Sequence, residues 1–536
     1  ETRTAPRSSM QLSWQVLERV WLLALVAGTL LLALTNLPYV PVTWFDEGSH
    51  LHVPKTLIQH GVYADISSEG YRYYGPTIGI GPTIMLPVAL TFKLFGVGLE
   101  QGRLVIVAYL LVALAASYAL TNRLHGRRIA LLAVTLLLAS RTVGYQGAIE
   151  YGRQVLGEIP GVAFLMLGML AWLAALRSDE RRTTNGEPPF DATQGRRPAS
   201  NCGRWSVVGG RWSMPILAGL GFGLALVTKN QFVLIVPPAL LLAGLLDWRY
   251  YRAGSWRLRI MPLVVACGCY GIWTLAQFQF LGPGSFIENM RQTRQAAGGA
   301  IFVFDRHAML RAGYYLLRPD LYGGLLIPAL LYALWRARQR DAQGLTEGLI
   351  ALMVGLWLTW YVVASLGWPR YAFPAVAFGA ILVARAIADL IGWLRQGNAL
   401  QRSGAIAVAL YAALAIIIPL TLSVRAITRP DDSAQRFATY LDSNVPQDAI
   451  VETWEPELGL LTDHRYHYPP IALLDTAVRH QWLGGPALAY NGLQDAPAYV
   501  VIGGFGAYTN IYSQALLERD YVEQTHVGTY TLFKRK

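Results

Sequence analysis

Charged residues and cysteine are both scarce in this sequence of 536 residues. Only 15% of the side chains are charged and 54% are hydrophobic, which is more apolar surface than one soluble core can hide. The three cysteines indicate neither a disulfide framework nor a metal site, because Cys267 and Cys269 lie in an apolar stretch and Cys202 lies in a basic loop. P-loop glycines are missing too, so no nucleotide-binding module is expected. The composition predicts an integral membrane protein.

The net charge of +12 does not indicate a nucleic-acid partner. The basic residues cluster in short segments between apolar stretches, as is typical of cytoplasmic loops beside anionic lipid. The first apolar stretch, Trp21 to Leu37, follows several arginines and lacks a convincing small-residue cleavage site. It therefore favours a membrane anchor over a cleaved signal peptide.

About eleven segments are long and apolar enough to span a bilayer, which takes about 20 residues in a helix. Their approximate bounds are 15–37, 101–121, 129–147, 155–176, 213–228, 231–247, 260–280, 320–337, 345–366, 371–394 and 404–424. Arginine-rich short loops alternate with sparsely charged ones, so the positive-inside rule places the former, and the N-terminus, in the cytoplasm. Residues 77–95 are also apolar, but counting them as a span would place every later loop on the opposite side of the membrane, including the arginine-rich ones. Their prolines and glycines favour an interfacial or re-entrant helix.

The composition changes near residue 425. Residues 1–424 form the predicted membrane domain, which carries an outer loop at 38–100 and a flexible cytoplasmic insert at 178–210. In residues 425–536, short β-rich runs alternate with helix-like stretches, which predicts a small α/β domain outside the membrane. The expected fold class is mainly α: a polytopic helical protein with its N-terminus inside and a small extracytoplasmic C-terminal α/β domain.

An acidic pair, Asp46 and Glu47, follows the first span directly. Two carboxylates at the membrane edge are costly unless they are used, although such a pair is often only a solvated loop. Transfer of a sugar to a hydroxyl needs a base near the acceptor and a cation near the departing phosphate. A carboxylate suits the first role and an arginine the second.

The predicted outer loops also contain arginines, against the positive-inside trend. Arg72 lies in the same loop as Asp46, and a second group comprises Arg291, Arg294, Arg306, Arg311 and Arg318. These arginines need an anionic partner, and a lipid phosphate is the obvious candidate. Nearby acidic residues or bulk lipid headgroups would satisfy them as well.

Two further groups near the acidic pair have alternative interpretations. Glu158 lies at the outer end of the fourth span, where it is either functional or simply the cap of that helix. His50, His52 and His60 suggest a divalent metal site together with Glu47 and Glu158, although their spacing matches no clear ligand pattern.

The order of these motifs resembles the membrane glycosyltransferases of GT-C fold. More narrowly, it is similar to the group of dolichyl-phosphate-mannose protein mannosyltransferases (PMT-like) and lipid A aminoarabinose transferases. The resemblance covers roughly 15–425. It is carried by the Asp46-Glu47 loop, Lys93-Leu94-Phe95-Gly96, Gly102-Arg103-Leu104, Leu226-Val227-Thr228-Lys229 and Pro369-Arg370-Tyr371-Ala372-Phe373-Pro374-Ala375.

The resemblance implies a polyprenyl-phosphate sugar as donor, inversion at the anomeric carbon, and no required cofactor, with a divalent metal possible. Asp46 would be the base, Glu47 its companion and Glu158 a second acidic residue. The residues expected to bind the donor phosphate are Arg72, Lys229, Arg306 and Arg370. Residues 71–76 lack the lysine-proline pair of the aminoarabinose transferases, so the sugar and the phosphate contacts of this loop stay open.

The sequence therefore predicts a glycosyltransferase of the plasma (inner) membrane, with its active site and C-terminal domain extracytoplasmic. It would move one sugar to a hydroxyl on a glycan, lipid or protein. Three alternatives stay open: a transporter or flippase of lipid-linked sugars, a lipid-pyrophosphate oligosaccharide ligase, and a membrane-anchored binding protein that acts through residues 425–536.

Overall fold

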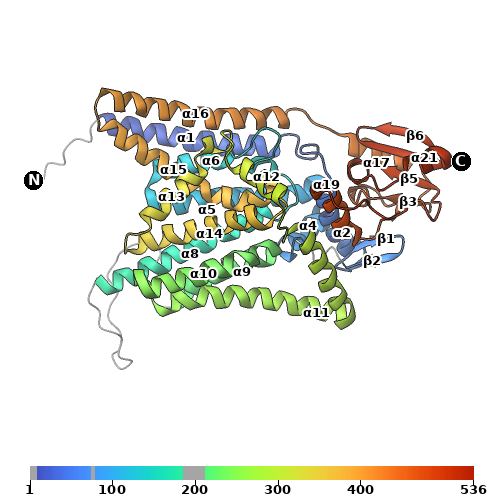
Figure 1. Cartoon of the computed structure of the whole chain (residues 1–536), viewed down its shortest axis with the longest axis horizontal. Coiled ribbons are helices and arrows are strands. Elements are labelled where there is room, and N and C mark those ends of the chain that lie inside the picture. The colour runs from blue at the N-terminus through green and yellow to red at the C-terminus, as the bar shows by residue number, and fades with distance from the viewer. Residues whose placement is uncertain (1–8, 74–78, 185–211) are drawn as a thin grey trace, which may run out of the picture.

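A long helical bundle makes up most of the molecule, with a small sheet region at one end (Figure 1). The computed structural model describes residues 9–73, 79–184 and 212–536. The bundle contains α1 (Ser9–Leu34), α5 (Leu99–His125), α6 (Arg127–Leu138), α8 (Glu158–Thr184), α9 (Ser213–Thr228), α10 (Val236–Leu246), α11 (Trp256–Ala300), α13 (Leu326–Arg336), α14 (Ala342–Ala364), α15 (Pro369–Arg395) and α16 (Ala399–Ile427). Among the described residues, 8 helices are long and apolar enough to cross a membrane. The prediction of an integral membrane protein agrees with this bundle.

Each predicted span overlaps a helix, but not every helix has the predicted length. The predicted span 129–147 is wrong at its C-terminal end, because α6 stops at Leu138. A polar run follows it, and the chain then reverses through a bridge between Thr142 and Tyr145, with Gly144 at a φ of 85°. The predicted interfacial helix is present as α4 (Pro82–Phe95), which begins at a proline. The predicted insert 178–210 begins later than expected, since α8 continues to Thr184, and its remainder lies outside the described residues.

The loops predicted to be cytoplasmic gather at one end of the bundle. Arg128 pairs with Glu18 of α1 at 2.8 Å, and the Tyr250 hydroxyl donates to the Arg338 carbonyl at 2.7 Å. Arg336 joins the same end through Glu347, at 3.2 Å. These contacts agree with the predicted alternation of loops, while the side of the membrane that this end faces stays a prediction.

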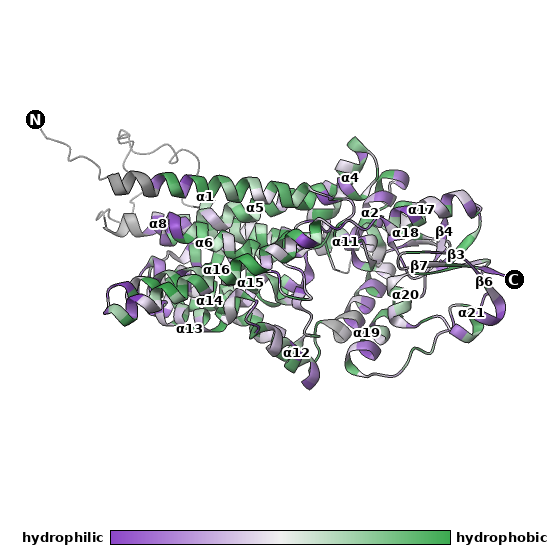
Figure 2. Cartoon of the chain, turned by 90° about the horizontal axis from the view of Figure 1, so that it is seen from above, coloured by the Kyte–Doolittle hydropathy of each residue, from purple (hydrophilic) through white to green (hydrophobic). Residues whose placement is uncertain are grey.

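The C-terminal region, residues 428–536, contains a mixed sheet with the strand order β4-β3-β5-β7-β6. Strand β3 (Ile450–Thr453) runs parallel to β4 (Arg465–His467) and β5 (Tyr499–Ile502), while β7 (Tyr530–Arg535) is antiparallel to β5 and β6 (Tyr521–Val527). The helices of this region are α17 (Ser433–Asn444), α18 (Glu457–Leu461), α19 (Leu473–Leu483), α20 (Gly504–Thr509) and α21 (Gln514–Asp520). Figure 2 shows the change from a hydrophobic bundle to this more polar region. The predicted α/β character is present, although the three-residue β4 gave no sequence signal.

Short elements of the first outer loop join the two parts. They are α2 (Phe45–His60) and the hairpin of β1 (Asp65–Ser67) and β2 (Gly70–Arg72), with α12 (Arg306–Leu316) farther along the chain. The short α7 (Ala148–Tyr151) lies between α6 and α8. Helix α18 packs backbone to backbone on α2, because a Cβ on Gly48 would lie 2.2 Å from the Glu457 nitrogen. Lys55 Nζ donates to the Gly459 and Thr462 carbonyls, at 2.8 and 2.6 Å. The C-terminal region therefore holds α2 in place.

Candidate active site

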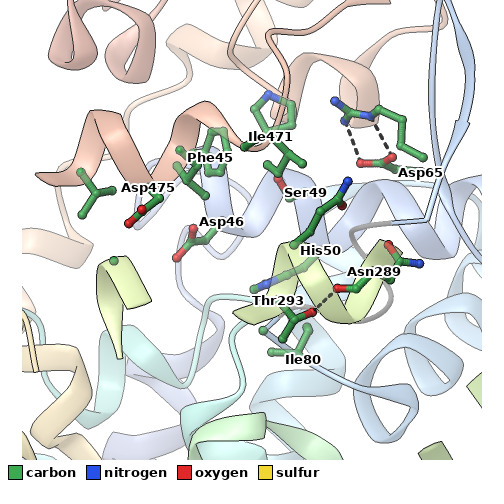
Figure 3. A pocket seen from close by; sticks show the side chains of 18 of the residues that line it. Phe45, Asp46, Ser49, His50, Asp65, Ile80, Asn289, Thr293, Ile471 and Asp475 are labelled. Carbon is green, nitrogen blue, oxygen red and sulfur yellow. Dashed lines mark hydrogen bonds and ion pairs between the residues drawn. The ribbon is translucent and has the colours of Figure 1, made fainter. Parts of the chain in front are cut away.

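A cavity of about 1030 Å³ lies between the end of the bundle and the C-terminal region. This volume is at the upper end of those typical for small-molecule sites. Its walls come from α2, the β1–β2 hairpin, residues 229–234, the C-terminal half of α11, the start of α15 and the C-terminal region. Figure 3 shows Asp46, Ser49 and His50 of α2 facing this space.

Asp46 lies in the first turn of α2 and lines the cavity. The turn places the carboxylate beside Arg370 of α15, with 2.5 Å between Asp46 Oδ2 and Arg370 Nη1. Burial alone would raise the pKa of Asp46, but the positive charge of Arg370 and the hydrogen bond from it lower the pKa below its usual value. Asp46 is thus an ionised, partly exposed carboxylate at the cavity wall.

Arg370 connects Asp46 to a second buried ion pair. Its Nε lies 3.3 Å from Glu158 Oε1, and the same oxygen lies 2.5 Å from Lys229 Nζ. Lys229 and Arg370 line the cavity, whereas Glu158 lies behind them. The Lys229 segment lies close to Gly157, where a Cβ would be 2.9 Å from Lys229 Cδ. Two carboxylates and two cations, predicted separately from four motifs, thus form one alternating network.

Glu47 points away from the cavity, although it is adjacent to Asp46. Arg103 of α5 donates to it twice, from Nε at 2.9 Å and from Nη2 at 2.6 Å, and both side chains are fully buried. The Val155 nitrogen donates to Glu47 as well, at 3.0 Å, and Arg103 also donates to the Leu37 and Pro41 carbonyls. The structure thus places Glu47 in the packing that holds α2, rather than beside Asp46 in the cavity.

The predicted outer arginines are mostly paired within the protein. Arg72 lines the cavity, but it donates twice to Asp65, at 3.0 and 2.8 Å, and stacks on Tyr468. Arg306 lies in the first turn of α12 and is not among the residues that line the cavity. Of the other members of that group, Arg291 pairs with Glu288, Arg318 pairs with Asp320 and Arg311 stacks on Trp482. The structure therefore brings Arg370 and Lys229 to Asp46, and not the predicted basic group.

The histidines near Asp46 have separate environments. His50 lines the cavity, and its Nδ1 lies 2.8 Å from the Val155 carbonyl, which makes Nδ1 the donor and leaves Nε2 as an acceptor. His52 faces α18, and burial lowers its pKa to about 3. Within the part of the chain that the structure describes, no three His, Cys, Asp or Glu side chains are grouped as metal ligands.

Aromatic side chains from distant segments line much of the cavity. Trp44, Trp368 and Tyr371 come from the membrane part, while Trp454 and Phe505 come from the C-terminal region. Trp44 also lies under the Arg370 guanidinium, at 5.1 Å from its ring centre. Of these aromatic residues, only Trp44 could have been expected near the site from the sequence, because it is two residues from Asp46. Nothing in the sequence of residues 428–536 indicates which of its side chains lie near Asp46.

Comparison with known proteins supports the resemblance that the sequence motifs indicated. The profile of the dolichyl-phosphate-mannose-protein mannosyltransferase family matches residues 81–184. By structure, the chain is similar to ArnT from Cupriavidus metallidurans bound to undecaprenyl phosphate, at 15% identity and a TM-score of 0.59 over 96% of this chain and 97% of that one. It is also similar to the archaeal oligosaccharyltransferase AglB from Archaeoglobus fulgidus in complex with an inhibitory peptide and a dolichol-phosphate, at 13% identity and a TM-score of 0.59 over 97% and 75%.

No curated protein matches the sequence. The structural similarities extend over nearly the whole chain, including the C-terminal region. They confirm the predicted GT-C fold, with its helical membrane part and its small C-terminal sheet region.

Proposed function

We propose that this protein transfers a monosaccharide from a polyprenyl-phosphate donor to a hydroxyl acceptor, with inversion at the anomeric carbon. The observation that carries the proposal is the meeting of Asp46 with Arg370 and Lys229 at one cavity wall. The fold shared with proteins solved in complex with undecaprenyl phosphate or dolichol-phosphate supports a lipid phosphate as the anionic group.

Asp46 is the proposed base. Its carboxylate removes the proton from the acceptor hydroxyl while the hydroxyl oxygen bonds to the anomeric carbon. The bond from that carbon to the phosphate oxygen breaks on the opposite side, and polyprenyl phosphate leaves with the electron pair. Asp46 suits this role because it is ionised and reaches the cavity, whereas Glu47 is enclosed by Arg103.

Arg370 and Lys229 are the proposed phosphate ligands. Both line the cavity and share Glu158, so a phosphate that enters between them replaces part of an existing anionic contact. Two cations near the leaving oxygen stabilise the charge that develops as the bond breaks. This scheme leaves out Arg72, which forms a separate ion pair with Asp65 away from the Asp46 network, and Arg306, which does not line the cavity. No metal is required in this scheme, since the two cations supply the positive charge.

The reaction is proposed to take place on the extracytoplasmic face of the plasma membrane. The elements that line the cavity, such as α2 and α19, lie at the end of the bundle next to the C-terminal region (Figure 1). The lipid tail stays in the bilayer while the acceptor, on a glycan, lipid or protein, enters between the bundle and the sheet. Holding both reactants in this way supplies much of the rate enhancement.

The test is a transfer assay with purified protein in lipid nanodiscs and a panel of radiolabelled polyprenyl-phosphate sugars. Wild type should release polyprenyl monophosphate, whose mass also distinguishes this reaction from that of a pyrophosphate-dependent ligase. The Asp46→Asn variant should lose roughly 10²- to 10⁴-fold in kcat while keeping its thermal stability, because a general base is removed from a partly exposed position. Full activity of that variant would rule out Asp46 as the base.

A further inference from the structure

The C-terminal half of α11 presents mainly uncharged polar side chains to the cavity, together with Glu288, which pairs with Arg291. The helix bends at Gly282, whose φ is 74°, and Ser285, Asn289, Gln292 and Thr293 beyond the bend all line the cavity. Their spacing places them on one face of the helix. Figure 3 shows Asn289 and Thr293 on this helix opposite Ser49 and His50 of α2.

Asn289 differs from its neighbours because its amide nitrogen is buried and has no hydrogen-bond partner. The residue is only 4% exposed, and its Nδ2 has no hydrogen-bond partner within the described part of the chain. Gln292 donates to Glu288 at 3.0 Å, and the Thr293 hydroxyl donates to the Asn289 carbonyl at 2.8 Å. A buried amide donor without a partner is costly, so its place at a cavity wall points to a ligand with a hydrogen-bond acceptor.

The charges around the cavity do not suit a cationic ligand. Each lining carboxylate of the described residues except the exposed Asp495 has a basic partner within 4 Å. The pairs are Asp46–Arg370, Asp65–Arg72, Glu69–His467, Glu288–Arg291 and Asp475–Arg479. Apart from the exposed Asp495, these carboxylates would offer a buried amino group on the ligand no unpaired anion to compensate its charge.

The cavity that Asn289 lines also contains the proposed base and phosphate ligands. Asp46, Lys229 and Arg370 line the same cavity as this face of α11. In the proposed function, the donor phosphate lies at Lys229 and Arg370, and its sugar extends from there into the cavity. The sugar of the donor is therefore the group that α11 can reach while its anomeric carbon remains near Asp46.

We infer that the face of α11 formed by Ser285, Asn289, Gln292 and Thr293 binds the donor's sugar, and that this sugar is neutral. The Asn289 amide donates to one of its hydroxyl oxygens. The inference rests on the proposed function, and it adds a specificity-determining residue and excludes amino sugars as the preferred donors.

The test measures the binding of lipids, without any transfer. Probes are undecaprenyl phosphate alone, its neutral glucose, mannose, galactose and arabinose conjugates, and its 4-amino-4-deoxyarabinose conjugate. They are titrated into wild type, Asn289→Leu and the control Asn444→Leu in nanodiscs. Asn444→Leu is the same chemical change at an exposed position of α17, where the Asn444 amide donates to the Tyr440 carbonyl.

Wild type should bind one neutral conjugate more tightly than the bare lipid phosphate and than the amino-sugar conjugate. Asn289→Leu should weaken that conjugate roughly 3- to 10-fold and leave bare undecaprenyl phosphate unchanged, as expected for one lost hydrogen bond. Its melting temperature should equal or exceed that of wild type, because a buried unsatisfied donor has been removed. Asn444→Leu should bind every probe as wild type does.

Equal affinity of wild type and Asn289→Leu for every conjugate would overturn the assignment of Asn289. Tightest binding of the amino-sugar conjugate would overturn the neutral sugar. Should Asn289→Leu fail to fold, Asn289→Asp keeps the shape, and it should weaken the neutral conjugate and strengthen the amino-sugar conjugate. Failure of the proposed function would look different, because bare undecaprenyl phosphate would then not bind or no conjugate would be turned over.

Discussion

The buried ion pair of Glu47 and Arg103 allows a quantitative test of why Asp46, and not its neighbour Glu47, is the proposed base. Both side chains are fully buried, and two hydrogen bonds join them. Removing one partner of such a pair leaves an uncompensated buried charge and costs about 3–5 kcal/mol. Glu47→Gln and Arg103→Met should each be destabilised by this amount.

The double variant should be destabilised by less than the sum of the single variants. Independent losses would add to about 6–10 kcal/mol. The double variant, however, contains no unpaired buried charge, so the cost of leaving one disappears. The Leu37 and Pro41 carbonyls still lose their donor, so some cost remains. We expect the double variant to lose no more than about 5 kcal/mol, which gives a coupling energy of at least about 1–2 kcal/mol.

The free energy of unfolding is measurable in mixed detergent–SDS micelles by tryptophan fluorescence, for which the chain has 16 tryptophans. Transfer activity of the folded fraction is measured in parallel. Asp46→Asn is the matched control, since it changes the adjacent carboxylate and should lose activity without this loss of stability. A Glu47→Gln protein as stable as wild type but inactive, or strictly additive losses, would refute the positioning role of Glu47.

Three further predictions concern the charged groups. Arg370→Gln should raise the KM for the donor roughly 10- to 100-fold, since a charge-assisted contact to phosphate is lost, and Arg370→Lys should recover part of it in the same assay. Burial raises the pKa of Glu455 to about 7 and that of its neighbour Glu457 well above its usual value. Above about pH 4.5 the unfolded chain releases these two protons, whereas the folded protein keeps them bound. Stability should therefore fall as pH rises from 5 to 8, and Glu457→Gln should raise the melting temperature at pH 8 more than at pH 5. Activity should persist in excess EDTA, and its loss with recovery on adding Mg²⁺ or Mn²⁺ would show that a metal takes part.

The spans could be predicted from the sequence because the bilayer demands long apolar helices, and the chain marks these by composition alone. Lys229 and Arg370 could be predicted from motifs, since each follows or begins a span. The orientation of adjacent residues could not. Successive positions on a helix point about 100° apart, so only the packed structure shows that Asp46 faces the cavity and Glu47 faces Arg103.

Contacts between distant segments could not be predicted from the sequence either. Lys55 binds the carbonyls of residues 459 and 462 across roughly 400 residues of chain, and Trp454 and Phe505 line the cavity by the same docking. Arg72 shows the same limit, because the sequence marks a basic residue in the expected loop but does not show that it pairs with Asp65. Local pattern gives the charge of a side chain, while its partner depends on the tertiary structure.

The contact of Asp46 with Arg370 predicts that donor binding activates the base. Burial raises the pKa of Asp46, but the positive charge of Arg370, with smaller contributions from His50 and Lys229, lowers it below its usual value, so the free carboxylate is a weak base. A donor phosphate draws the guanidinium's charge to itself, and the pKa of Asp46 should then rise. Because kcat/KM reports the free enzyme and kcat reports the bound complex, the acid limb of kcat should lie at higher pH than that of kcat/KM for the donor. Coincident acid limbs, measured with saturating acceptor, would show that the phosphate leaves the charge on Asp46 unchanged, and Arg370 would then be a structural partner of the base.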